Sequence, residues 1–326
     1  MVATALLEQE NNRHIRKIDL ARDLENVADL IEMCFPIASD PDGQRYVNQM
    51  RKSAREMRLF RWLSKLAEVG NMRASGFVYE ENEQIIANLS LIPYRRGGSQ
   101  ITMIANVAVH PDHRRKGIAR KLTKRALGYL QRQNVRHVWL QVRDDNLPAI
   151  NLYRYLGFKD RAVRTTWRVR PKDVIHYSGV SDNGINISPR KRMVWPLQKE
   201  WLANIYPKSI RWNFPVNFSR FTPGLLQQVT NLLDGYYLRH WAIGKKNRLY
   251  GIISWHKTDS FANNLWLAIS EEEEDKVLPT GLVKVCKRLP QHHPLSIDYP
   301  VGRFRMQFEA LGFEEFRTLI WMEANL

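Results

Sequence analysis

Apolar and polar residues alternate in three successive stretches of the first third of the chain, which predicts antiparallel strands joined by polar or glycine turns. The stretches are SGFVYE (75–80), IIANLSLI (85–92) and ITMIANVAV (101–109). Apolar residues at helical spacing precede them over 24–34 and from about 44 to 69. A short strand, HIRKIDL (14–20), comes first, and Asp23 is placed to cap the first helix or to be its first-turn acid.

The third strand runs into a basic turn, HPDHRRKG (110–117), which leads to an amphipathic helix. The apolar face of that helix consists of Ile118, Leu122, Ala126 and Leu130. It is followed by a short strand (137–142), a short helix (148–156) and another strand (161–169). This order predicts an α/β (α+β) fold with a mixed, mostly antiparallel central sheet flanked by helices.

The pattern partly repeats after residues 171–196, a stretch rich in proline and glycine that we interpret as a linker. The repeat has three strand-like stretches (234–243, 248–257 and 263–270), a helix from about 279 to 288, a strand near 295–299 and a final helix and strand. Residues 151–169 also resemble residues 306–324, with Leu-Gly-Phe at the same place in both. We therefore predict a duplicated domain, with segments 1–170, 171–196 and 197–326.

The net charge of +17 is uneven: residues 1–170 carry 30 Lys and Arg against 18 Asp and Glu, and residues 171–326 carry 20 against 15. Such a basic half suggests an anionic partner, which can be nucleic acid, an acidic membrane or a phosphorylated cofactor, although a solvated surface needs none. No apolar run approaches the ~18 residues of a membrane span, and we expect no signal peptide. Cys34 and Cys286 suggest buried thiols rather than a disulfide or metal site. We expect a cytoplasmic protein with no metal and no membrane partner.

The basic turn has the chemistry of a phosphate site, because the start of a helix presents unpaired backbone N–H groups and partial positive charge. Gly117 has no Cβ to keep a pyrophosphate from those groups, and Ala119 is also small. The charge around them comes from Arg114, Arg115 and Lys116. A basic helix start without a ligand would show the same residues, so the turn alone decides nothing. The motifs GxxxxGK[ST] and GxGxxG do not occur.

Two motifs in a fixed order give the turn its context. They are R-x-x-G-x-A (Arg114 to Ala119) and, further along, N-x-x-A-x-x-L-Y-x-x-x-G-F (Asn146 to Phe158). With the strand before the first motif and the helix after it, residues 12–170 resemble the GNAT family of acyl-CoA-dependent N-acetyltransferases. The resemblance implies acetyl-CoA as cosubstrate and two GNAT-like domains in tandem, of which the second is degenerate.

The resemblance also implies which residues bind the cofactor. Backbone amides of Arg114, Arg115, Lys116, Gly117, Ile118 and Ala119 would hold the pyrophosphate, and backbone groups of Val107, Ala108 and Val109 would line the pantetheine arm. Asn146 would help to fix the cofactor, cap the short helix, or do both. Tyr153 would donate a proton to the departing thiolate, or only pack the helix onto the sheet. A strand N–H such as that of Val109 would stabilise the oxyanion.

The chain departs from the family pattern at the general base. The strand 101–109 has no Glu or Asp, and its polar residues Thr102 and Asn106 cannot act as bases. We expect Glu80, Glu81 and Glu83 to be solvated turn residues and His110 to be structural. We therefore name no base: it lies on another element, acts through water, or is not needed by an amine that arrives neutral.

The second copy departs much further. It has Phe308 at the position of Tyr153, Val301 at that of Asn146, and EEEED (271–275) where the first copy has the basic turn. Five acids would repel a pyrophosphate, and we expect them to form a solvated face. We therefore expect no cofactor site in this copy and a role in shaping or covering the acceptor site. Its Trp241, Trp255 and Trp266 are expected to be core residues.

Three functions remain to be compared. The first is transfer of an acetyl or other acyl group to an amine, and the second is acyl-CoA sensing or scaffolding without turnover. The third, nucleic-acid binding, lacks a recognisable reading motif, and we do not expect it. The acceptor, a small molecule or a protein or peptide amine, would meet the segment 36–44, in which Asp40 and Asp42 need no ligand to explain them.

Overall fold

The computed structural model describes residues 14–63, 75–96, 99–174, 184–246 and 248–326. The chain forms two compact units, which are described in turn. The first unit contains residues 1–142, 146–160 and 322–326, and the second contains residues 143–145 and 161–321.

The sheet of the first unit follows the chain in the order β1-β2-β3-β4-β5. Its strands are β1 (Ile15–Lys17), β2 (Ser75–Glu81), β3 (Gln84–Arg96), β4 (Ser99–Val109) and β5 (His137–Arg143). The first four pair antiparallel, whereas β4 and β5 pair parallel. The last residues of the chain complete this unit: Glu323 lies 3.0 Å from His137 Nδ1, and the N–H of Leu326 donates to the carbonyl oxygen of Arg136.

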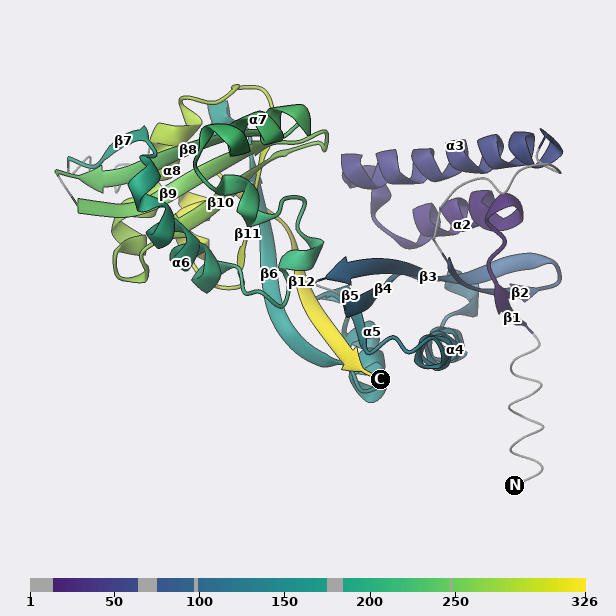
Figure 1. The fold of residues 1–326 in the computed structure, drawn as a ribbon. Helices are drawn as coiled ribbons and strands as arrows, with labels where there is room; N and C mark the ends of the chain where they lie inside the picture. The colour runs from purple at the N-terminus through teal and green to yellow at the C-terminus, as the bar shows by residue number, and fades with distance from the viewer. Residues whose placement is uncertain (1–13, 64–74, 97–98, 175–183, 247) are drawn as a thin grey trace. The chain divides into compact units, whose positions relative to one another are not determined.

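Helices cover both faces of this sheet. On one face lie α2 (Leu20–Cys34) and α3 (Pro41–Leu63), and on the other lie α4 (Ile118–Arg132) and α5 (Leu147–Tyr155) (Figure 1). The expected apolar face of α4 is confirmed, since its four residues are all buried. The end of the long second helix expected to about residue 69 lies outside the described residues, because 64–74 are not part of them.

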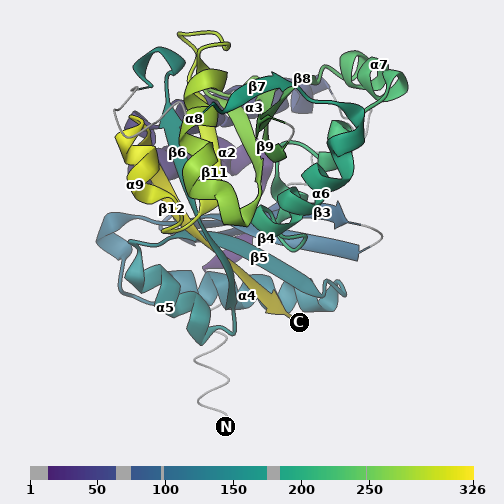
Figure 2. The same ribbon diagram turned by 90° about the vertical axis from the view of Figure 1, so that its left-hand side faces the viewer.

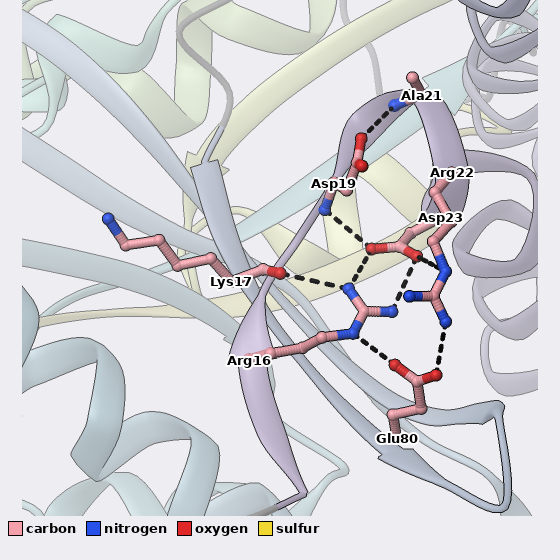
Figure 3. A network of polar contacts seen from close by, with 7 residues as sticks. All are labelled: Arg16, Lys17, Asp19, Ala21, Arg22, Asp23 and Glu80. Atoms are coloured by element: carbon pink, nitrogen blue, oxygen red, sulfur yellow. Dashed lines mark hydrogen bonds and ion pairs between the residues drawn. The ribbon is translucent and has the colours of Figure 1, made fainter.

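The start of α2 is held by a charged network (Figure 3). Asp19 is the N-cap and accepts from the N–H of Ala21, so Asp23 takes the other expected role, that of first-turn acid. Asp23 is fully buried and accepts from Arg16 at 2.5 and 2.9 Å and from the N–H of Asp19 at 2.8 Å. Burial alone would raise the pKa of Asp23, but these hydrogen bonds outweigh it and lower the pKa.

The second unit repeats the same plan. Its strands follow the order β6-β11-β10-β9-β8-β7, with β12 (Glu314–Asn325) beside β6. The other bounds are β6 (Lys159–Val169), β7 (Asn186–Pro189), β8 (Tyr237–Lys245), β9 (Arg248–Lys257), β10 (Asn263–Ile269) and β11 (Leu295–Pro300). Here β10 and β11 pair parallel, like β4 and β5, and the pairs from β7 to β10 are antiparallel. The helices are α6 (Trp195–Ile205), α7 (Leu225–Leu233), α8 (Glu274–Cys286) and α9 (Arg305–Ala310) (Figure 2).

The shared Leu-Gly-Phe has the same conformation in both units. Gly157 and Gly312 follow α5 and α9 with φ of +89° and +83°, a region that favours glycine. The N–H of Phe158 donates to the carbonyl of Tyr153, and that of Phe313 donates to the carbonyl of Phe308. These bonds end the two helices in the same way, so the repeat reflects a common helix-ending turn.

The boundaries between the parts differ from those expected. The structure divides the chain after residue 160 rather than 170, because β6 pairs with β11 from Arg164 to Val169. The expected linker 171–196 contains β7, which pairs with β8; residues 175–183 of it lie outside the described residues. The fold class is confirmed: each unit has a mixed, mostly antiparallel sheet flanked by helices, and the three expected core tryptophans are buried.

Candidate active site

The turn between β4 and α4 brings the sequence-predicted phosphate residues together. Gly117 immediately precedes the first residue of α4 and has φ of +72°, and Arg115 also has a left-handed backbone (φ +66°). A Cβ built on Gly117 would find only the flexible guanidinium of Arg120, at 3.7 Å, within contact range. The space beside the glycine is therefore open, and the residues fit a bound pyrophosphate at the first turn of the helix.

The basic side chains of this turn are exposed, and one of them hydrogen-bonds to the strand before it. Arg114, Arg115 and Lys116 all lie on the surface, whereas Ile118 is buried and anchors the helix. The Nε of Arg114 donates to the carbonyl of Val109 at 3.1 Å. The three basic side chains therefore place positive charge around the first amides of α4. The turn is held at one end by the hydrogen bond from Arg114 and at the other by the buried Ile118.

The strand β4 leaves its neighbour before it reaches this turn. Its parallel pairing with β5 runs from Ile101 and His137 to Ile104 and Leu140. Val107, Ala108 and Val109 lie beyond that last pair, so the two strands have separated there. Ala108 is buried and the two valines are partly exposed.

A bulge in β4 sets the direction of these backbone groups. Ser90 pairs with Ala105 and Asn88 with Ala108, so two residues of β4, one of them Asn106 with φ of +52°, face one residue of β3. The N–H of His110 donates to the carbonyl of Ile86 on β3. Because successive N–H groups on a strand point to opposite sides, the Val109 N–H points away from β3, toward the side on which β5 has separated.

Residues that the sequence did not single out support this bulge. The side chain of Asn88, fully buried, donates to the carbonyl of Asn106 at 2.9 Å. Asn106 in turn donates through Nδ2 to Tyr46 Oη on α3 at 2.7 Å. Cys34, expected to be buried, is half-buried and donates from Sγ to the carbonyl of Val109 at 3.3 Å. The sequence signal that could have indicated this bulge was an asparagine in each of two apolar strands, Asn88 and Asn106.

Helix α5 places the other two predicted residues. Asn146 is its N-cap and accepts through Oδ1 from the N–H of Ala149 at 3.2 Å, so the capping role is present. Tyr153 is buried in the last turn, and its ring meets that of Phe158 edge-on at 5.8 Å. Burial raises the pKa of Tyr153, so its phenol stays protonated at neutral pH.

The acids near the strand end are engaged elsewhere. Glu80, expected to be solvated, pairs with Arg16 and with Arg22, the latter at 2.6 Å (Figure 3). The hydrogen bond from Arg16 lowers the pKa of Glu80, which makes it a weak base. Glu81 lies 3.3 Å from His113, and Glu83 sits in the tight turn with φ of +63°.

His110 has the structural role expected for it. It is the N-cap of the 3₁₀ turn Pro111–His113, where its Nδ1 accepts from the N–H of Asp112 at 3.4 Å. Thr102 is buried and Asn106 is bonded to Tyr46, so the described part of β4 offers no side chain that can act as a base.

The segment expected to meet the acceptor lines a cavity of about 350 Å³ in the first unit. Its walls come from the end of α2 and the start of α3: Glu32, Phe35, Pro36, Ile37, Ala38, Gln44 and Asn48. Asp40 accepts through Oδ1 from the N–H of Asp42 at 3.2 Å, which shows a role in the turn for Asp40.

In the second unit Glu271, Glu272 and Asp275 of the acidic run are exposed, as expected of a solvated face, but Glu274 is not. This residue is buried at the first turn of α8, where it accepts from Tyr299 Oη and, at 2.7 Å, from Arg303 Nε. Burial raises the pKa of Glu274 while Arg303 opposes that rise. Among the described acids of the run Glu274 alone turns inward, because the helix start and the arginine both stabilise its carboxylate. One of the chain's own acids therefore occupies the helix start that corresponds to the phosphate turn.

Known proteins are similar to this chain over the segment that contains the candidate site of the first unit. Residues 24–158 match the model of the acetyltransferase (GNAT) family. They belong to that family. The segment is similar to ribosomal protein bS18-alanine N-acetyltransferase of Escherichia coli, 39% identical over 62 residues, and to streptothricin acetyltransferase of Streptomyces lavendulae, 36% identical over 73 residues. The matches cover 19% and 22% of this chain but only 42% and 38% of those relatives.

A solved structure resembles the second half of the chain as well as the first. A tandem GNAT protein from the clavulanic acid biosynthesis pathway resembles the chain with a TM-score of 0.51 at 15% identity, over 95% of this chain and 98% of that one. The likeness shows the fold, and it agrees with two GNAT units in tandem. Within the described ranges no helix is both long and apolar enough to cross a membrane.

Proposed function

We propose that this chain is an N-acetyltransferase that moves an acetyl group from acetyl-CoA to an amine, with one site, in the first unit. The observation that carries the proposal is the open space beside Gly117 at the start of α4, directly after a strand that has separated from its neighbour. Family membership of residues 24–158 supports it.

Each predicted residue has a defined task in this proposal. Acetyl-CoA supplies the activated acyl thioester. The amides of Arg114–Ala119 bind its pyrophosphate, and the backbone of Val107–Val109 binds its pantetheine arm. The Val109 N–H stabilises the oxyanion that forms when the amine attacks. Tyr153, kept neutral by burial, donates its proton to the thiolate, and Asn146 holds the start of α5 in place.

The amine loses its proton without a side-chain base on β4. Glu80 is paired with an arginine, Glu81 lies beside a histidine, and Glu83 lies in a turn. The amine therefore arrives neutral or loses its proton to water. The rate then rises with pH as more of the acceptor becomes neutral.

The acceptor is an amine that approaches the cavity between α2 and α3. One relative acetylates an alanine of a ribosomal protein and another is named for streptothricin, so both protein and small-molecule amines are candidates. Glu32 on the cavity wall is paired with Arg51, so its carboxylate does not select for charge on the acceptor.

The alternative is a sensor that binds acyl-CoA without turnover, and the missing strand carboxylate favours it. The two are separated by incubating the protein with acetyl-CoA and a panel of amines, peptides and N-terminal peptide mimics while free thiol is detected. Thiol release that depends on both the amine and the protein supports the enzyme. Binding of acetyl-CoA with no thiol release from any acceptor supports the sensor.

A further inference from the structure

Helix α7 of the second unit turns its apolar face outward. Five of its nine residues are large aliphatic side chains that are mostly exposed: Leu225 (81%), Leu226 (88%), Val229 (55%), Leu232 (62%) and Leu233 (81%). Its remaining residues are polar, and none is charged. Such a face on one short helix is a marker of an interaction site.

The helix is fixed in this orientation by its polar side. The buried Asn231 donates through Nδ2 to the carbonyl of Arg220 at 2.8 Å and accepts from Gln227 Nε2 at 2.8 Å. Arg220 also pairs with Asp234, which follows the last helical residue, at 2.5 Å. Turning the helix to bury its leucines would break these contacts, so the apolar face is held outward by the fold itself.

The exposed residues are symmetric about Val229. The sequence LLQQVTNLL places a leucine three and four residues before it and three and four residues after it. A twofold axis through Val229 therefore sets Leu225 of one copy against Leu233 of a second copy, and Leu226 against Leu232. An interface between identical chains needs such a self-complementary pattern, because each patch must meet itself.

We propose that α7 is a homodimer interface, in which it packs antiparallel against α7 of a second copy about an axis at Val229. Covering these side chains removes roughly 500 Å² per copy from water, or about 1,000 Å² for the pair, which is the lower limit for a biological interface. A membrane surface fits less well, because helices that lie on membranes carry Lys and Arg on their polar face and α7 has neither.

The first test is the mass of the full chain in solution, by sedimentation or light scattering at micromolar concentration. The expected mass is twice the 38.3 kDa of one chain. A monomer over the whole concentration range would overturn the proposal. So would a monomer that floats with phosphatidylglycerol vesicles, since the face would then belong to a membrane.

The second test uses the symmetry directly. Val229→Glu and Val229→Lys each place two like charges together at the axis, and each is expected to weaken dimerisation at least tenfold. A one-to-one mixture of the two is expected to recover the dimer, because only a twofold interface sets residue 229 against itself. The matched controls are Gln228→Glu and Gln228→Lys, which put the same charges on the exposed neighbour beside the apolar stripe.

Circular dichroism and melting temperature establish that each variant is folded. Folded Val229 variants that stay dimeric when alone, or that do not associate when mixed, would place the interface elsewhere and overturn the proposal.

Discussion

The backbone N–H of Phe158 donates to the carbonyl oxygen of Tyr153 at 3.0 Å, and the Phe158 ring lies edge-on to the Tyr153 ring. Neither contact uses the phenolic hydroxyl. Tyr153 is thus positioned by groups that a phenylalanine at the same place would keep, so its hydroxyl can be tested apart from its packing.

Tyr153→Phe is therefore expected to leave the melting temperature and acetyl-CoA affinity nearly unchanged and to lower kcat by roughly 10²–10⁴-fold, the usual contribution of a positioned acid. Tyr155→Phe is the matched control, since that tyrosine lies in the same helix and is 68% exposed. Both are measured by thiol release and calorimetry. Wild-type turnover in Tyr153→Phe would leave the residue with a packing role alone.

Gly117→Glu is expected to abolish the rise in melting temperature that acetyl-CoA produces. A side chain at φ of +72° is strained, and this one puts negative charge where the pyrophosphate would sit. Gly128→Glu, the same change near the other end of α4, should keep the rise, because a Cβ there meets only Arg132 at 3.7 Å. An equal rise in both variants would move the cofactor site elsewhere.

Asp23→Asn is expected to lower the free energy of unfolding by about 1–3 kcal/mol, because it removes one of the two carboxylates that pair with the part-buried Arg16 and leaves only Glu80. The figure is below that of a fully buried pair because Arg16 is 29% exposed. Asp29→Asn removes a surface pair with Arg51 and should cost about 0–1 kcal/mol. Urea unfolding measures both, and equal losses would show that the network around Asp23 adds nothing.

The same network predicts that the folded protein loses stability at low pH. The pKa values of Asp23 and Glu80 are lowered in the folded protein, so the stability they contribute is present above the pKa of the unfolded carboxyls, ~4. It is lost as pH falls below that value, because the unfolded chain then binds protons that the native state does not. Asp23→Asn should reduce the slope of stability against pH in this range; an unchanged slope would contradict the assignment.

His240, in the second unit, predicts a second loss of stability as the pH falls. Burial, with the nearby Arg190, lowers the pKa of His240 to about 3, against ~6.5 for an unfolded histidine. Stability is therefore full above about pH 6.5 and falls as pH drops toward 3, because the unfolded chain takes up the proton first. Melting curves between pH 7.5 and 4.5 measure this, and His240→Gln should reduce the slope, with the remainder due in part to His256, whose pKa burial lowers to about 4. A variant with the same slope would place the titration elsewhere.

Phe308→Tyr tests the second unit at the position equivalent to Tyr153. Phe308 is fully buried and meets the rings of Trp167, Tyr299, Phe304 and Phe313. A hydroxyl without a partner there should cost about 1–3 kcal/mol and create no activity. Acetyl-CoA bound at two sites per chain in this variant, measured by calorimetry, would show that the second site needed only the hydroxyl.

The sequence was sufficient for features that depend on local pattern. The apolar face of α4, the glycine before it and the short strand after it follow from periodicity and from the chemistry of one turn. The bulge at Asn106 could not be predicted, because it depends on the hydrogen bond from Asn88 on the neighbouring strand. Pairing across strands is invisible to a local pattern.

Charges were the other source of error. A run of acids is usually solvated, yet Glu274 turns inward because Arg303, far along the chain, lies beside it. Likewise Glu80, near a turn, joins Arg16 from the first strand. The short β7 was hidden within a proline- and glycine-rich stretch, since its partner strand, β8, begins some fifty residues later.

The last strand, β12, begins in the second unit and ends in the first, where Glu323 and Leu326 meet His137 and Arg136. During synthesis, the first unit therefore lacks its final strand until residues 322–326 have left the ribosome. A fragment cut at residue 170 would expose the edge of β5, which invites aggregation. The first unit therefore cannot be obtained simply by truncation, and deletion of residues 322–326 would perturb the half that is furthest away in sequence.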